Sequence, residues 1–129
     1  MAHEQILVVE DNEKSMKLFR DVLQATGYRT LEAGTAEDAV SLAMEHVPSL
    51  ILMDVQLPGI DGVEGLARLR AGERTASTPV LALTAQAMHG DRERFLAAGF
   101  DGYLAKPVDI VELLHVVGQH CLVGEPPQR

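Results

Sequence analysis

The sequence has little cysteine, little positive charge and no long hydrophobic run. Because Cys121 is the one cysteine of the chain, an intramolecular disulfide cannot form. No apolar stretch approaches the length of a signal-peptide core or a membrane span. These absences argue against a disulfide-stabilised secreted scaffold and against a membrane protein, and we expect a cytoplasmic location.

Positive charge is scarce, since 11 lysines and arginines stand against 19 acidic residues and leave a formal net charge of −8. Repulsion between this chain and a polyanion disfavours nucleic acid and anionic membranes as partners. The densest basic group is interspersed with acidic residues, which predicts a solvated helix face rather than a binding stripe. Its members are Arg68, Arg70, Arg74, Arg92 and Arg94.

Length and composition indicate one folded unit. The chain has 129 residues, of which 47% are hydrophobic and 23% charged, as in an ordinary globular domain. Residues 124–129 lack apolar side chains and contain two prolines. We therefore expect a domain over residues 1–122 and a disordered C-terminal tail over residues 123–129.

Short apolar runs alternate with segments of helical periodicity along the whole chain. This alternation predicts an α/β domain with a mostly parallel sheet built from five strand–helix units. The runs at residues 6–9, 50–53 and 80–83 have no polar interruption, which is typical of central strands covered on both faces. The alternating run at residues 28–33 and the short run at residues 103–105 predict the two edge strands.

The helical segments carry start and stop signals of unequal strength. Gly27 offers a left-handed stop for the first helix, Thr35 is a hydroxyl N-cap for the second, and Pro48 prevents the second from continuing. The fourth segment, residues 86–99, has few large apolar side chains and contains Gly90. We expect local mobility there.

Polar side chains stand at the ends of four predicted strands: Glu10 with Asp11, then Asp54, Thr84 and Lys106. In parallel α/β sheets, ligands bind outside the carboxyl ends of the strands. Three clustered carboxylates would repel one another without a divalent cation, and an all-oxygen ligand set favours Mg²⁺ or Mn²⁺. A lysine and a hydroxyl can hold the oxygens of a phosphoryl group on an aspartate. The set therefore predicts phosphoryl transfer at Asp54.

Four segments of the sequence, in this order and spacing, carry a family resemblance. They are residues 6–12 (ILVVEDN), 53–62 (MDVQLPGIDG), 83–85 (LTA) and 98–107 (AGFDGYLAKP). Over about residues 4–121 the chain resembles a response-regulator receiver domain, and in particular the stand-alone, single-domain receivers of the DivK type. The resemblance implies a flavodoxin-like (CheY-like), doubly wound sheet of five parallel strands in the order 2-1-3-4-5, with five helices.

The resemblance also implies roles for the acidic residues. Asp54 corresponds to the phosphoacceptor, which takes a phosphoryl group from a phosphohistidine. Asp11 corresponds to a direct Mg²⁺ ligand, together with Asp54 itself and the backbone carbonyl of Gln56. Glu10 corresponds to a residue that contacts the metal through water.

Further family positions implied by the resemblance concern the switch and its lifetime. Thr84 and Lys106 correspond to the pair that binds the phosphoryl oxygens, and Tyr103 to the aromatic residue that turns inward when the threonine moves. Pro107 follows the lysine in what the family usually makes a cis peptide bond. Gln56 and Gln86 occupy the two positions that influence the loss of the phosphoryl group to water, and as amides they predict no extreme lifetime.

The function implied is a phosphorylation-controlled switch of protein–protein interactions in two-component signalling. The expected donor is a sensor histidine kinase or a histidine phosphotransfer protein. The expected output is a downstream regulator bound at the face formed by the fourth helix, the fifth strand and the fifth helix. We expect no enzymatic activity beyond self-catalysed phosphorylation and autodephosphorylation. A shuttle that passes the phosphoryl group onward, and a receiver excised from a hybrid histidine kinase, remain open, as does the oligomeric state.

Three other interpretations fit the residues less well. A phosphohydrolase of the haloacid-dehalogenase type needs a second acid two residues after the nucleophile, where this chain has Gln56. A flavodoxin-like cofactor binder needs a phosphate loop after the first strand, where this chain has residues 10–12 (EDN). A degenerate receiver would lack a chemical residue, and none is missing here.

Overall fold

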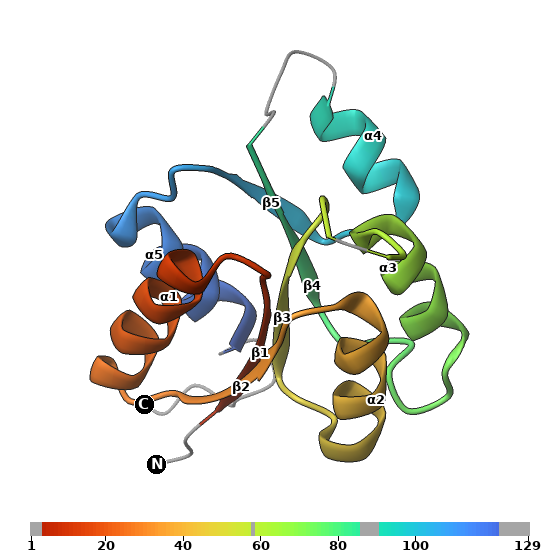
Figure 1. Cartoon of the computed structure of the whole chain (residues 1–129), viewed down its shortest axis with the longest axis horizontal. Helices are drawn as coiled ribbons and strands as arrows, with labels where there is room; N and C mark the ends of the chain where they lie inside the picture. The colour runs from red at the N-terminus through yellow and green to blue at the C-terminus, as the bar shows by residue number, and fades with distance from the viewer. Residues whose placement is uncertain (1–3, 58, 86–90, 122–129) are drawn as a thin grey trace.

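In the computed structural model, which describes residues 4–57, 59–85 and 91–121, five strands alternate with five helices (Figure 1). The strands are β1 (Gln5–Val9), β2 (Arg29–Ala33), β3 (Leu50–Asp54), β4 (Val80–Thr84) and β5 (Gly102–Ala105). The helices are α1 (Glu13–Ala25), α2 (Ala36–His46), α3 (Gly62–Ala71), α4 (Asp91–Ala98) and α5 (Ile110–Cys121). The predicted strand–helix alternation is confirmed.

The strands form one parallel sheet in the order β2-β1-β3-β4-β5, as predicted. The register places Asp54 opposite Leu83 and Thr84 opposite Ala105. Parallel strands in this register end at the same edge of the sheet. Side chains at or just after the strand ends are therefore brought together, although they are far apart in the sequence.

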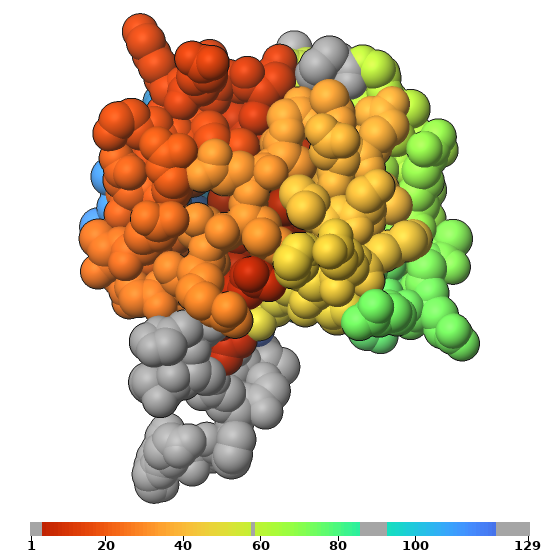
Figure 2. All heavy atoms as spheres, turned by 60° about the horizontal axis from the view of Figure 1, so that its bottom comes forward, coloured from red at the N-terminus to blue at the C-terminus, as the bar shows by residue number. Residues whose placement is uncertain are grey.

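Burial along the strands follows the predicted division into central and edge strands. Every residue of β3 and β4 is buried, and so are residues 6–9 of β1. Strand β2, at one edge, exposes Arg29 and Glu32. In the space-filling view, side chains of α1 (red-orange) and α2 (yellow-orange) lie on either side of this strand (Figure 2).

The helices cover both faces of the sheet, with α1 and α5 on one face and α2, α3 and α4 on the other (Figure 1). Alternate residues of β1 serve the two layers. Val8 belongs to the core layer that contains Phe19 of α1 and Val117 of α5, whereas Val9 belongs to the layer that contains Leu66 of α3 and Phe95 of α4. Burial of apolar surface in both layers is the main stabilising contribution to the fold.

Side-chain caps fix the start of four helices. Asn12, Thr35, Asp61 and Asp109 each accept a hydrogen bond from the backbone N–H three residues later. The predicted cap at Thr35 is confirmed. The predicted stop at Gly27 is also confirmed, because Gly27 follows α1 closely with φ +108°.

The end of α2 agrees with the predicted barrier at Pro48. The helix ends at His46, and Val47 adopts a left-handed conformation with φ +47° and ψ +67°. A β-branched residue in this region is strained. The sequence pattern contains no signal for it.

Arg70 corrects part of the charge interpretation. Its guanidinium group donates hydrogen bonds to backbone carbonyls rather than facing solvent, whereas Arg68 forms a surface pair with Glu64. The solvated-face interpretation is therefore wrong for Arg70.

None of the helices in the described residues has both the length and the apolar content needed to cross a membrane.

The weak fourth helical segment is only partly covered by the structure. Helix α4 begins at Asp91 and is the shortest of the described helices. The predictions on Gln86, on mobility around Gly90 and on the tail at residues 123–129 concern positions outside the described residues.

Candidate functional site

Lys106 joins two of the predicted carboxylates at the carboxyl edge of the sheet. Its Nζ lies 2.7 Å from Oε1 of Glu10 and 2.8 Å from Oδ2 of Asp54. Both acidic side chains are buried, and the lysine side chain is 22% exposed. One ammonium group thus compensates two carboxylates in a largely desolvated place.

The strands position these side chains directly. Asp54 and Thr84 are the last residues of β3 and β4, Glu10 follows β1, and Lys106 follows β5. Backbone pairing continues past the strand ends, because the Lys106 N–H donates to the Thr84 carbonyl at 2.7 Å. The Glu10 N–H likewise donates to the Ala33 carbonyl at 3.0 Å. The sheet register therefore fixes where each functional group stands.

Each buried carboxylate is oriented by two different donors. Oδ1 of Asp54 accepts the Gln56 N–H at 2.8 Å, which leaves Oδ2 to Lys106. Oε2 of Glu10 accepts the Asn12 N–H at 3.2 Å, which leaves Oε1 to the same lysine. Backbone donors that hold one oxygen aim the other, so both carboxylates face Lys106 in a defined orientation.

Glu10, Asp11 and Asp54 form an acidic cluster that fits a divalent cation. One carboxylate oxygen from each residue lies within 4.8 Å of the others. Asp11 is exposed, and the other two are buried. An all-carboxylate set of hard oxygen ligands matches Mg²⁺ better than zinc or copper. The cluster can therefore bind a metal ion, as the sequence predicted.

Burial and charge perturb the titration of the site. Burial raises the pKa of Glu10, and the nearby Asp54 carboxylate raises it further, whereas Lys106 acts in the opposite direction without cancelling the rise. Burial lowers the pKa of Lys106, but its hydrogen bonds to Asp54 and Glu10 outweigh burial and raise it overall. Burial and the neighbouring Asp54 thus oppose the ionisation of Glu10, whereas the two carboxylate partners of Lys106 favour its charged form.

The residues predicted to form the switch are on β4 and β5. Thr84 is 2% exposed. Tyr103 is half-buried, and its ring centroid lies 6.2 Å from that of Phe95 on α4, with the rings tilted by 46°. The Lys106–Pro107 peptide bond is cis. Of the two residues expected to affect phosphoryl lifetime, Gln56 is exposed next to Asp54, and Gln86 lies outside the described residues.

Gly62 also constrains the site, although the sequence singled it out only as the last residue of the segment 53–62 that carries the family resemblance. A Cβ at this position would lie 2.6 Å from the Asp54 carbonyl oxygen and 2.8 Å from Cα of Val55. The Gly62 N–H donates to the Val55 carbonyl at 3.2 Å. The first residue of α3 thus packs directly against the backbone that carries Asp54, and only glycine fits without a shift.

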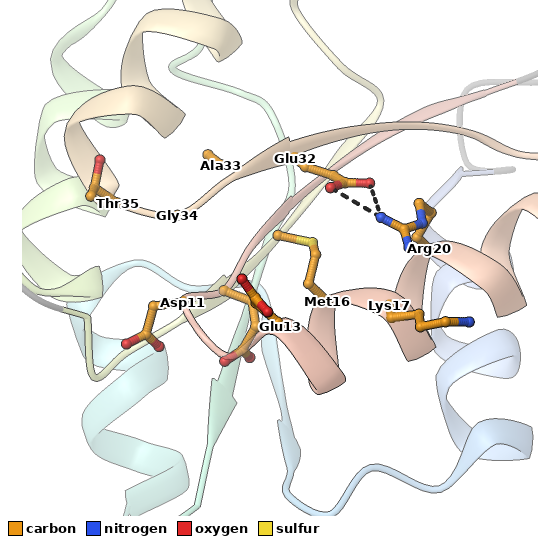
Figure 3. Close-up of a pocket in the computed structure, with 10 residues that line it drawn as sticks. Asp11, Glu13, Met16, Lys17, Arg20, Glu32, Ala33, Gly34 and Thr35 are labelled. Carbon is orange, nitrogen blue, oxygen red and sulfur yellow. Dashed lines mark hydrogen bonds and ion pairs between the residues drawn. The ribbon is translucent and has the colours of Figure 1, made fainter.

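A groove of about 650 Å³ between α1 and the β2–α2 connection opens onto the acidic cluster. Glu10 and Asp11 are among its lining residues. Figure 3 shows Met16 between Asp11 and the ion pair of Arg20 with Glu32, whose closest atoms are 3.1 Å apart. The groove gives solvent access to the cluster from the α1 side.

Comparison with known proteins identifies this arrangement. The family model described as "Response regulator receiver domain" matches residues 6–118. The chain belongs to the response-regulator receiver family. Accepting a phosphoryl group in two-component signalling is the generic function of these domains, and the predicted resemblance is confirmed.

Relatives of this receiver domain include the polar-differentiation response regulators DivK of Brucella. The protein from Brucella ovis is 43% identical over 112 residues, which cover 87% of this chain and 91% of the relative. The DivK protein of Brucella anthropi is 42% identical over the same length. The likeness to DivK-type receivers thus extends over most of both chains.

Solved structures confirm the CheY-like fold and provide a precedent for the metal. The receiver domain of the sensor histidine kinase PA1611 from Pseudomonas aeruginosa is 38% identical, with a TM-score of 0.86, and the match covers 93% of this chain and 98% of that one. It holds a magnesium ion in its active site cleft. The chemotaxis regulator CheY4 of Vibrio cholerae is 25% identical with a TM-score of 0.86, over 92% and 98% of the two chains.

Proposed function

We propose that Asp54 of this receiver accepts a phosphoryl group from a phosphohistidine of a sensor histidine kinase or a histidine phosphotransfer protein. The observation that carries the proposal is the position of Lys106, with Nζ 2.8 Å from Asp54 and 2.7 Å from Glu10. A protonated lysine in this position can stabilise negative charge on an incoming phosphoryl group. Among Glu10, Asp11 and Asp54, only Asp54 is the last residue of a central strand with one oxygen aimed at the lysine and the other held by the backbone.

The proposed transfer forms one bond and breaks one. A carboxylate oxygen of Asp54 forms the new bond to phosphorus while the phosphorus–nitrogen bond of the phosphohistidine breaks. The electron pair leaves on the imidazole nitrogen, which takes a proton from solvent. Lys106 neutralises charge on the phosphoryl oxygens, and the Thr84 hydroxyl donates a hydrogen bond to one of them.

We propose that Mg²⁺ is the cofactor, with Mn²⁺ as a substitute. Asp11, Asp54 and the backbone carbonyl of Gln56 would hold the ion directly, and Glu10 would contact it through water. The close approach of the three carboxylates supports this assignment, because their oxygens lie within 4.8 Å of one another. When bound, the ion neutralises negative charge that would otherwise oppose the approach of a phosphoryl group.

The proposed output is a change in a protein–protein interface. A phosphoryl group adds about −1.5 to −2 charges and three acceptor oxygens, which draw the Thr84 hydroxyl toward Asp54. The space that Thr84 leaves lets Tyr103 bury its ring further. Because this ring contacts Phe95, the change reaches α4 and alters the face formed by α4, β5 and α5. A downstream regulator that binds this face would read the switch.

Several finer assignments belong to the same proposal. The amide side chains of Gln56 and Gln86 set a moderate phosphoryl lifetime, because they neither act as bases nor repel water. The protein turns over no separate substrate, and its own aspartyl phosphate hydrolyses instead. We also propose a cytoplasmic location, which the single cysteine of the chain supports. The receiver domain comprises residues 1–122.

The first test is intact mass spectrometry after incubation with Mg²⁺ and acetyl phosphate. The wild-type chain should gain one phosphoryl group, and Asp54→Asn should gain none. Asp61→Asn is the matched control, because Asp61 is an exposed aspartate whose capping role an asparagine can keep. This variant should be phosphorylated like the wild type.

A chelator should abolish the gain in mass in every variant. Phosphorylation of Asp54→Asn to the wild-type level would exclude Asp54 as the acceptor. Steady release of phosphate from small phosphoesters without a persistent phosphoprotein would contradict the switch and favour a hydrolase.

A further inference from the structure

Arg70 connects several separate segments at the amino end of the sheet, opposite the acidic cluster. From the last turn of α3, its Nη1 donates to the carbonyls of Ala76 at 3.2 Å and Thr78 at 2.6 Å. Its Nη2 donates to the carbonyl of Gly99 at 3.1 Å and to the carboxylate of Asp101 at 2.9 Å. The planar fork of a guanidinium group can serve four acceptors at once, which an ammonium group in the same place cannot do.

Asp101 extends the connection into the sheet. The carboxylate oxygen that accepts from Arg70 also accepts the Val80 N–H at 2.8 Å, and the Asp101 N–H donates to the Val80 carbonyl at 2.8 Å. The arginine side chain is 26% exposed, so its charge-assisted bonds are partly shielded from water. We call this set, the Arg70 guanidinium group with its four acceptors, the Arg70 clamp.

The clamp acts on the C-terminal end of α4. Gly99 directly follows this helix, adopts φ +112°, and donates its N–H to the Leu96 carbonyl at 3.1 Å. Phe100 likewise donates to the Phe95 carbonyl, and the two rings pack edge to face with centroids 6.0 Å apart. Among the described side chains at positions 93–98, only that of Phe95 is buried. The helix is therefore held mainly at its last turn.

The other end of α4 follows the strand that carries Thr84. Strand β4 ends at Thr84, and the next helix or strand along the chain is α4, which begins at Asp91. Figure 1 shows α4 reaching α3 with its C-terminal end. A change at Thr84 thus arrives at the N-terminal end of a helix whose C-terminal end is fixed.

We propose that the Arg70 clamp is the pivot of the switch, and that Arg70 is a positioning residue for it. Because the clamp holds the last turn of α4 against α3 and β4, a displacement that starts at Thr84 moves only the first turns of the helix. Without the clamp, the same displacement spreads along the whole helix and into the turn before β5. This inference rests on the proposed function, since it needs a change at Thr84 to transmit.

The test uses beryllium fluoride with Mg²⁺ as a non-covalent mimic of the phosphoryl group. Site-resolved amide hydrogen exchange is measured with and without the mimic, at the Gly99, Phe100 and Asp101 amides. In the wild type the mimic should change exchange in the first turns of α4 and leave these three amides unchanged. In Arg70→Met the mimic should accelerate their exchange by about tenfold.

The ratio of the exchange rates with and without the mimic separates a pivot from a merely structural role. Loss of structural support alone would speed exchange equally with and without the mimic. Arg70→Lys keeps the charge but not the fork, and should behave like Arg70→Met. Arg68→Met is the matched control, because Arg68 is on the same helix and bonds only to Glu64 among the described contacts; it should behave like the wild type.

Asp101→Asn is the second variant, should Arg70→Met fail to fold. It keeps an oxygen acceptor for the Val80 N–H and weakens the bond to Arg70, so the mimic should still speed exchange at Gly99. If the wild type responds to the mimic, and Arg70→Met and Asp101→Asn show the same ratios of exchange rates with and without it, the proposed role of the clamp is wrong and the proposed function stands. A wild-type chain with no response to the mimic would overturn the proposed function and the clamp together.

Discussion

The positive charge of Lys106 is shared between two buried carboxylates, those of Glu10 and Asp54. The lysine contacts both Glu10 and Asp54, yet a single positive charge cannot fully compensate two buried carboxylates. The pKa of Glu10 is raised as a result, first by burial and then by repulsion from Asp54. A divalent cation would neutralise the remaining negative charge, so the raised pKa of Glu10 and the proposed binding of a metal have the same physical origin.

Glu10→Gln should stabilise the chain in the presence of a chelator. The variant removes a carboxylate whose ionisation is opposed by burial and by Asp54, while Lys106 keeps its partner Asp54 at 2.8 Å. We expect an increase of about 1 kcal/mol in the free energy of unfolding at pH 7, measured by urea denaturation. Glu13→Gln is the control, because Glu13 is exposed and forms no ion pair among the described residues; it should change stability little.

The advantage of Glu10→Gln should shrink as the pH falls. Because the pKa of Glu10 is raised on folding, the folded state binds more protons than the unfolded state between the ordinary glutamate pKa and the raised one. As the pH falls through this window, the stability of the wild type therefore approaches that of the variant. A difference that is constant from pH 7 to pH 4, or a variant less stable than the wild type at pH 7, would contradict this account.

Strand β3 and helix α3 form the structural unit that presents the proposed acceptor. The strand carries Asp54 at its last position, and the helix starts at Gly62 against the backbone of Asp54 and Val55. The turn between them is pinned from both sides, because Gln56 donates to the Asp54 carboxylate and Gly62 donates to the Val55 carbonyl. The acceptor geometry thus depends on close packing of the first residue of the helix.

Gly62→Ala should destabilise the protein by about 1–3 kcal/mol in urea unfolding. The added Cβ would meet backbone atoms at 2.6 and 2.8 Å, so the helix start or the strand end must move. The intrinsic helix preference of alanine, worth up to about 1 kcal/mol, does not offset this overlap. Gly118→Ala in α5 is the matched control: its Cβ would meet no atom within 4 Å, so it should be neutral or stabilising.

Phosphorylation of Gly62→Ala should also be slower than that of Gly118→Ala, because the overlap displaces the carbonyl of Asp54 itself. The measurement is the rate of mass gain with acetyl phosphate. If Gly62→Ala has the stability and the phosphorylation rate of the wild type, the contact at Gly62 imposes no constraint on the site.

The strands and the site could be predicted from the sequence because their signals are local. Uninterrupted apolar runs mark the buried strands, and the rule that parallel strands end at one edge brings Glu10, Asp54, Thr84 and Lys106 together. The roles of Arg70 could not be predicted, because its acceptors are up to 31 residues away in the sequence and three of them are backbone carbonyls.

Across the whole molecule, the two ends of the sheet have different proposed roles. The carboxyl end gathers the acidic cluster and Lys106, where the proposed phosphorylation would change the charge. The amino end holds the Arg70 clamp, where hydrogen bonds join α3, β4 and the turn before β5. Helix α4 follows the strand that carries Thr84, and its C-terminal end is at the clamp. A local electrostatic event can in this way become a directed movement of one element.

Binding of Mg²⁺ should stabilise the whole fold, because the cluster draws its ligands from two strand ends that come together only on folding. A ligand that binds only the folded state at ten times its dissociation constant adds about 1.4 kcal/mol, which corresponds to a rise of about 5 °C in Tm for a domain of this size. Thermal denaturation with increasing Mg²⁺, monitored by circular dichroism, checks this. Asp11→Asn should abolish most of the rise, since Asp11 is the exposed member of the cluster.

Asp38→Asn provides the control for the loss of one negative charge, because Asp38 is exposed in the first turn of α2 and is not part of the cluster. It should keep the full Mg²⁺-dependent rise in Tm. General screening of the net charge of −8 would instead raise Tm equally in both variants, and equal concentrations of a monovalent salt at matched ionic strength would reproduce it. Such a result would place the stabilisation on the surface as a whole and contradict a specific site at Glu10, Asp11 and Asp54.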